Sequence, residues 1–114
     1  MLIIIARFEF SEASRSRVLA IVRNMDAETA KEAGCLFYKH AIDIDNSNRI
    51  ILSEIWTDAA RLLAHFHSLH FRTFRAAVAE LGIRSTLDQF NGIETKADAP
   101  ENWRSLLRKS LANE

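Results

Sequence analysis

The hydrophobic pattern of this sequence switches repeatedly between a period of two residues, typical of strands, and a period near 3.6, typical of helices. The period of two recurs at residues 2–10, 35–45, 49–56 and, less regularly, 83–94. Helical spacing fills the two long gaps between these stretches. This order predicts an α+β fold of the ferredoxin-like split βαβ type, β-α-β-β-α-β, with an antiparallel four-stranded sheet and both helices on one face.

The two long helical regions carry start and stop signals. In residues 12–33, apolar side chains recur at helical spacing until Gly34 ends the pattern. The second region begins with a Thr-Asp pair at 57–58 that suits an N-cap, and its apolar stripe ends near Gly82. Within it, Ser68 is a candidate cap for a fresh turn, which would divide the region into two helices.

Residues 46–48 read Asn-Ser-Asn, which predicts the turn of a hairpin between the second and third strands. We assign residues 1–94 to the ferredoxin-like body and 95–114 to a C-terminal amphipathic helix of the same domain. Asp98 is a suitable N-cap for this helix. Its apolar positions are Trp103, Leu106, Leu107 and Leu111. We expect this helix to act as a packing lid or a dimer clasp.

The predicted strands are apolar on both faces over much of their length. The first strand places Ile4 and Phe8 on one face and Ile3 and Ile5 on the other. Because both helices of a split βαβ fold cover the same face, the other face lacks a cover within the chain. We therefore predict a homodimer in which two sheets pack face to face.

Composition excludes several classes of protein. The 114 residues suit one domain, and Lys plus Arg equals Asp plus Glu at 15 each, so no net charge recruits nucleic acid. The apolar start at 1–6 is too short for a membrane span or a secretory signal, and the lone Cys35 cannot form an internal disulfide. No glycine-rich phosphate loop is present. We expect a soluble, cytoplasmic protein without nucleic-acid or membrane partners.

Several motifs lie on this framework. Residues 32–38 read Glu-Ala-Gly-Cys-Leu-Phe-Tyr, residues 43–45 read Asp-Ile-Asp, residues 54–56 read Glu-Ile-Trp, and His65 is followed by His70-Phe71. They resemble the antibiotic biosynthesis monooxygenase (ABM) domain. In that family Glu-x-Gly-Cys/Asn-x-x-Tyr opens the second strand, Glu-x-Trp closes the third, and His-x-x-x-x-His-Phe spans the following helices. The resemblance covers residues 2–93.

The resemblance implies a dimeric α+β barrel with a pocket in each subunit between the sheet and the helices. Family enzymes include small oxygenases that oxidise quinols or aromatic polyketides without metal or flavin, haem-degrading oxygenases, and processors of a phosphorylated signal. The haem-degrading branch is disfavoured, because its strand-one Asn falls near Arg7 or Phe8 and its haem-ligating His falls near Arg75. The run Phe-Asn-Gly at 90–92 is similar to the signal-processing relatives.

We predict a cofactor-independent monooxygenase that oxidises a quinol-like or polyhydroxylated aromatic small molecule with O2. Such chemistry needs a base near pH 7, donors for a developing oxyanion and a dry aromatic cavity. His65 or His70 is the candidate base. The candidate substrate-binding residues are Arg7, Tyr38, Trp56, Phe66 and Phe74.

Structural roles are the alternatives for the same residues. A histidine in an apolar stripe is often a buried, hydrogen-bonded one. Trp56 and Tyr38 also suit the core or a dimer interface, Arg7 suits an ion pair on the sheet, and Glu54 suits a hydrogen-bonding carboxylate on a strand.

A metal site is not expected. His65 and His70 are five residues apart, which does not align two ligands on one helical face, and no fixed carboxylate partner is evident. Two other functions stay open. One is an isomerase or degradative enzyme for a small signalling or keto compound, with proton abstraction by the same base and no oxygen. The other is a non-catalytic dimer that binds an aromatic ligand.

Overall fold

The computed structural model describes residues 1–92 and 103–112. In chain order its elements are β1 (Leu2–Glu9), a 3-10 turn η1 (Glu12–Ser14), α1 (Arg15–Thr29), β2 (Cys35–Asp43), β3 (Asn46–Trp56), α2 (Ala59–Phe66), α3 (Leu69–Glu80), β4 (Arg84–Asn91) and α4 (Trp103–Ala112). The predicted element order and the ferredoxin-like α+β fold are confirmed. The predicted domain boundary at residue 94 and the predicted cap Asp98 lie outside the described residues.

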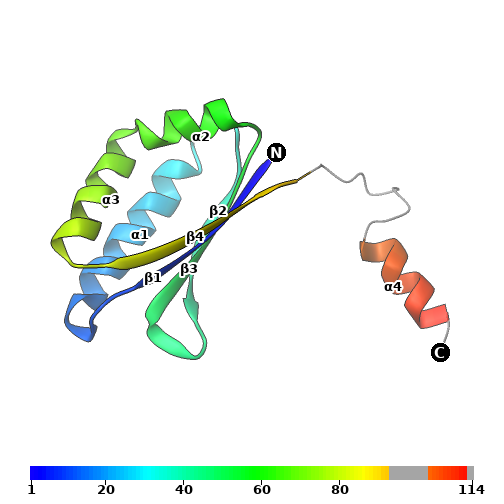
Figure 1. Ribbon diagram of the computed structural model, residues 1–114, viewed down its shortest axis with the longest axis horizontal. Helices are drawn as coiled ribbons and strands as arrows, with labels where there is room; N and C mark the ends of the chain where they lie inside the picture. The colour runs from blue at the N-terminus through cyan, green and yellow to red at the C-terminus, as the bar shows by residue number, and fades with distance from the viewer. Residues whose placement is uncertain (93–102, 113–114) are drawn as a thin grey trace.

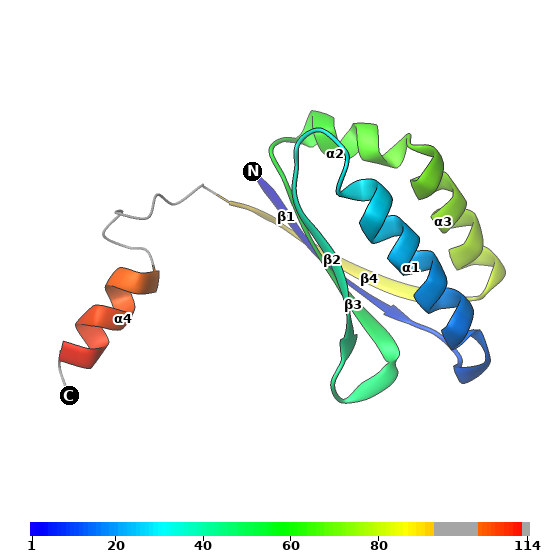
Figure 2. The ribbon, with the colours of Figure 1, turned by 180° about the vertical axis from the view of Figure 1, so that it is seen from behind.

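The strands form one antiparallel sheet in the order β2-β3-β1-β4. In Figure 1 and in the view from behind in Figure 2, α1, α2 and α3 lie on the same side of this sheet. The described helix α4 lies apart from this body in both views. No helix in the described part of the chain is long and apolar enough to cross a membrane.

Alternation along the strands decides which side chains the helices cover. In the antiparallel register, the inner face pairs Ile4 with Glu54 and Ala6 with Leu52, and all four are buried. The apolar core is completed from the helices by Val18, Val22, Met25, Leu62 and Phe74. Removal of this apolar surface from water is the main driving force that holds the helices on the sheet.

Ser68 divides the second helical region, as its capping potential predicts. Its hydroxyl oxygen accepts the Phe71 backbone N–H at 3.2 Å, and the hydroxyl donates to the His65 carbonyl oxygen at 2.7 Å. The serine therefore starts α3 while it satisfies a carbonyl at the end of α2. The break turns the chain so that residues of α2 and α3 need not follow one continuous helical stripe.

Two predicted boundaries are wrong. The first helix ends at Thr29 rather than at residue 33. After it, the Lys31 and Glu32 backbone N–H groups donate to the carbonyl oxygens three residues earlier instead of four, and Gly34 follows with a φ of +81°. The hairpin turn lies at 44–45 rather than at 46–48. There the Asp43 side chain accepts the Asp45 backbone N–H at 2.8 Å, which tightens the turn one step earlier in the chain.

The outer face of the sheet changes from apolar to charged along the strands. At one end, Phe37, Ile55, Ile3 and Phe90 form a row across all four strands. Near the other end, Glu9 accepts hydrogen bonds from Arg49 at 3.1 Å and from Arg84 at 3.0 Å. The apolar row is the part of this face that most needs a cover.

Candidate active site

A cavity of about 310 Å³ lies between the inner face of the sheet and α3. The sheet lines it through Ile4, Ala6, Phe8, Tyr38, Leu52, Glu54, Ser85 and Leu87, and the helices line it through Phe66, Phe71, Phe74, Arg75 and Val78. The cavity forms here because small Ala6 lies between larger neighbours on β1 while α3 supplies aromatic rings above it. Its lining is mostly apolar, with few polar groups that can orient a ligand.

Glu54 is the carboxyl group of this cavity. The strand register places it on the inner face of β3, between Tyr38 of β2 and Ile4 of β1, and only 5% of the residue is exposed. Burial raises the pKa of Glu54 to about 7, although the hydrogen bond that its carboxylate accepts from the Trp56 indole N–H favours the charged form. A carboxyl group with this pKa can exchange a proton with a ligand near neutral pH.

Tyr38 lies beside this carboxyl group. Burial raises the pKa of its phenol above the ordinary value of 10, and the negative charge of Glu54 adds to the effect. The Tyr38 hydroxyl therefore stays protonated at neutral pH and can donate a hydrogen bond. A hydroxyl donor and a proton acceptor that line the same cavity can together bind and deprotonate a hydroxyl group of a ligand.

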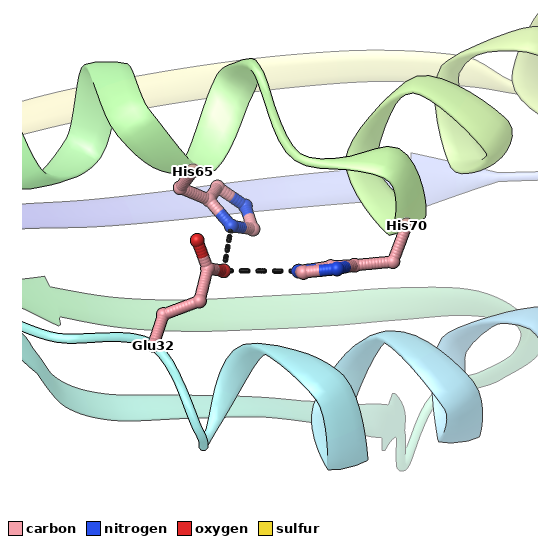
Figure 3. A group of neighbouring side chains, drawn as sticks. All are labelled: Glu32, His65 and His70. Atoms are coloured by element: carbon pink, nitrogen blue, oxygen red, sulfur yellow. Dashed lines mark hydrogen bonds and ion pairs between the residues drawn. The ribbon is translucent and has the colours of Figure 1, made fainter.

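His65 and His70 converge on Glu32 (Figure 3). The Oε2 atom of Glu32 lies 2.5 Å from Nδ1 of His65 and 2.9 Å from Nε2 of His70. His65 lies in the last turn of α2, His70 in the first turn of α3, and Glu32 in the turn after α1. The helix break at Ser68 makes this convergence possible. Neither histidine lines the cavity.

The His65 ring instead lies behind the aromatic wall of the cavity. Its centroid is 4.9 Å from that of Trp56, 5.1 Å from that of Phe71 and 5.5 Å from that of Tyr38. Burial lowers the pKa of His65, and Glu32 partly opposes this shift. The imidazole is thus a buried contact for Tyr38 and Phe71, which line the cavity.

The other predicted site residues are divided between three places. Tyr38, Phe66 and Phe74 line the cavity. Trp56 is fully buried and contacts Glu54 through its indole N–H at 2.8 Å, without lining the cavity. Arg7 lies on the outer face of the sheet, where its guanidinium is 3.7 Å from the Asp88 carboxylate. The structure therefore does not bring Arg7 to the same space as the aromatic residues.

Two functional candidates, Glu54 and Arg75, were not assigned to the site from the sequence. The signal for Glu54 was a carboxylate between apolar Leu52 and Trp56 on one strand face. Arg75 belongs to the polar side of a helical stripe, and only its position near the sheet brings it to the cavity. Glu32 lies in a turn, where the sequence has no helical or strand periodicity. The spacing of residues along the chain therefore does not predict its contact with the histidines.

A buried contact between a histidine and a carboxylate lies at the edge of the core. Nδ1 of His40 is 2.7 Å from Oδ1 of Asp26. The other carboxylate oxygen of Asp26, Oδ2, lies 3.8 Å from the Lys39 ammonium. Burial lowers the pKa of His40. Because only 3% of its side chain is exposed, His40 is neutral at pH 7 and acts as a packing contact for Phe8 and Phe74.

Comparison with known proteins adds independent information. Residues 1–77 match the family model for antibiotic biosynthesis monooxygenase. Among solved structures, Rv0793 from Mycobacterium tuberculosis has a TM-score of 0.76 and 26% identity, over 84% of this chain and 98% of that one. PA3566 from Pseudomonas aeruginosa has a TM-score of 0.75 and 26% identity, over 82% and 94%. Comparison with curated proteins gives no significant match.

Proposed function

The chain belongs to the antibiotic biosynthesis monooxygenase family, and on that basis we propose that it oxidises a quinol-like or polyhydroxylated aromatic small molecule with O2 and without a bound cofactor. The observation that carries this proposal is Glu54, a buried carboxyl group with a pKa of about 7 in an aromatic cavity. General-base catalysis is most effective when the pKa of the base lies near the working pH.

In the proposed reaction, Glu54 takes the proton of one aromatic hydroxyl group. The phenolate passes an electron to O2, and recombination of the two radicals joins oxygen to a ring carbon. Overall, a hydroquinone and one O2 give a hydroxyquinone and one water, so one oxygen atom enters the ring and the other leaves as water. The protein supplies the base, the orientation of the ring and the exclusion of bulk water.

Tyr38 and Arg75 supply the donors in this proposal. Tyr38 pairs with Glu54 in the strand register and lines the same cavity. Arg75 is the cation of the cavity lining, without an ion-pair partner among the residues that the structure describes. A guanidinium group at this position stabilises the phenolate that forms when Glu54 accepts the proton. Phe66 and Phe74 enclose the ring.

His65 and His70 are positioning residues in this proposal. Their hydrogen bonds to Glu32 hold α2 and α3 against the turn after α1, and the His65 ring supports Trp56, which in turn holds Glu54. The competing assignment, in which either histidine is the base, requires a rearrangement, because neither ring lines the cavity.

The proposed enzyme is a homodimer. The helices cover one face of the sheet, and the row of Phe37, Ile55, Ile3 and Phe90 crosses the other face. Phe37 is 48% exposed and Phe90 is 55% exposed in the single chain. A second copy packed sheet to sheet would bury this row.

The test is oxygen uptake with a panel of hydroquinones. We expect Glu54→Gln, which keeps the shape of the side chain, to lower turnover by roughly 100-fold or more. Glu80→Gln is the matched control, because this exposed carboxylate pairs with Arg17 on the surface. Full activity in Glu54→Gln would overturn the role of this residue. A loss of turnover in His65→Ala and His70→Ala but not in Glu54→Gln would instead indicate that a histidine is the base.

The same carboxyl group favours one second candidate, an isomerase or degradative enzyme that abstracts a proton without oxygen. Both reactions start with Glu54 as the base, so the variants do not separate them. Turnover under strictly anaerobic conditions separates them, because the isomerase or degradative reaction continues without O2 and the monooxygenase reaction does not. Binding of aromatic compounds without turnover in either atmosphere would instead indicate a ligand-binding protein.

A further inference from the structure

We propose that Glu32, His65 and His70 form a binding site for a divalent transition-metal cation. The sequence argued against such a site on two grounds, the spacing of the histidines and the lack of a carboxylate. Neither ground holds in the structure. The break at Ser68 places the two histidines on separate helices, and the turn after α1 brings Glu32 between them.

The geometry suits one shared ion. One oxygen of Glu32 and one nitrogen from each histidine all lie within 4.8 Å of one another. Figure 3 shows both rings directed at the same carboxylate oxygen. Ligand atoms bound to one cation at about 2.1 Å lie about 3.0–3.4 Å apart. Small side-chain movements therefore suffice to convert the present contacts into coordination.

The charge balance also favours a cation. The Glu32 side chain is 18% exposed, and among the described residues its ion-pair partners are the two histidines alone. Among the described residues no lysine or arginine pairs with Glu32, so no permanently charged side chain balances its carboxylate. A mostly buried carboxylate is costly unless a positive group compensates it. A divalent cation would supply that charge.

Space for further ligands is present beside His70. A hollow of about 250 Å³ between α1 and α3 is lined by His70, Asn24 and Thr73 together with apolar side chains of both helices. Three protein ligands leave coordination positions open, and water in this hollow would fill them.

The ligand types indicate the class of ion. Two imidazole nitrogens and one carboxylate oxygen favour Zn²⁺, Fe²⁺ and related first-row cations over Mg²⁺ or Ca²⁺, which prefer oxygen ligands. The three ligands come from three separate segments, so the ion would fasten α2 and α3 to the end of α1. It would lie outside the lining of the 310 Å³ cavity. Its role is structural and does not depend on the proposed oxidation.

The experiment uses the full chain without an affinity tag, treated with a chelator and then dialysed. Co²⁺ is titrated in by visible absorption and Zn²⁺ by calorimetry, with Mg²⁺ as the contrasting ion. We expect one Co²⁺ or Zn²⁺ per chain, an absorption spectrum of nitrogen-ligated Co²⁺, and no heat with Mg²⁺. We also expect Zn²⁺ to raise the Tm of the wild-type protein.

Glu32→Gln and His70→Gln test the ligands, and His67→Gln is the matched control because His67 is an exposed histidine between the two ligands. Loss of a direct ligand should weaken binding by more than the roughly 10- to 100-fold that loss of an outer-shell partner costs. His67→Gln should bind as the wild type does. Circular dichroism checks that each variant is folded.

The wild-type titration alone can overturn the proposal. No stoichiometric binding of Co²⁺ or Zn²⁺ at micromolar protein, or a spectrum of hydrated Co²⁺, would show that the cluster is only a hydrogen-bonded one. Equal affinity in Glu32→Gln and wild type, or loss of binding in His67→Gln, would place the ion elsewhere. Oxygen uptake is measured separately, so failure of the metal site leaves the assignment of Glu54 untouched, and the reverse also holds.

Discussion

The indole N–H of Trp56 donates a 2.8 Å hydrogen bond to the carboxylate of Glu54, two residues earlier on the same face of β3. Both residues are buried, at 0% and 5% exposure. The bond stabilises the ionised form of a carboxyl group whose burial stabilises the neutral form. The balance of these two effects leaves a proton acceptor with a pKa of about 7 beside Tyr38.

The first prediction is the pH dependence of activity. Glu54 accepts a proton only when it is ionised, so kcat/KM should rise with pH through about 7, where the group loses its proton. Trp56→Phe removes the donor that favours the ionised form, and should move the midpoint to higher pH by up to about 1 unit. The measurement is kcat/KM between pH 5 and pH 9.

Trp103→Phe in α4 is the matched control, because Trp56 and Trp103 are the two tryptophans of the chain. It should leave the midpoint unchanged. A midpoint that moves to lower pH in Trp56→Phe, or that does not move, would contradict the proposed link between the indole and the carboxyl group.

The second prediction concerns stability and pH. The pKa of Glu54 is raised from 4.5 in the unfolded chain to about 7 in the folded one. Its stabilising contribution is therefore complete below pH 4.5 and is lost as pH rises through about 7, with a total of about 3 kcal/mol. Glu54→Gln cannot ionise, so the variant should gain stability relative to wild type as pH rises.

The measurement is the free energy of unfolding of both proteins by urea at several pH values. The buried rings of His40 and His65 have lowered pKa values and act in the opposite direction as pH falls below 6.5. Their contribution is common to both proteins and cancels in the difference. A difference that stays constant across this range would show that Glu54 titrates at its ordinary pKa in the fold.

Arg75 allows the third prediction, on the donor side of the cavity. Arg75→Gln removes the guanidinium that faces the proposed phenolate, and should lower kcat/KM by roughly 100-fold with little change in Tm. Arg72→Gln is the matched control one turn earlier on α3, where the side chain contacts the Ser68 carbonyl at 3.4 Å and does not line the cavity. Equal effects of the two substitutions would exclude a specific role for Arg75.

Much of the fold could be predicted from the sequence, because periodicity reports directly on which face of an element is covered. Alternation along β1 also separates Arg7 from Ala6 and Phe8, so the position of Arg7 on the outer face follows from the same rule. The capping signal at Ser68 likewise predicted the helix break.

The grouping of Glu32 with the histidines was not predictable in this way. Glu32 lies in a turn, and its hydrogen-bond partners are 33 and 38 residues away in the chain. Such contacts depend on the exact path of the turn and on how α2 and α3 lie across α1. Periodicity contains no information on either.

The last prediction concerns the outer face of the sheet. Phe37 lies in the apolar row with Ile55 and Ile3, and it is already 48% exposed in the single chain. Phe37→Lys should therefore cost the isolated fold little, whereas in a sheet-to-sheet dimer it would place a charge in an apolar interface. We expect light scattering after size exclusion to give a dimer for the wild type and a monomer for Phe37→Lys at micromolar concentration.

Leu69→Lys is the matched control, at a 72% exposed position at the start of α3, and it should remain dimeric. A monomeric wild type would contradict the predicted dimer. A dimeric Phe37→Lys would show that the dimer interface does not include the apolar row.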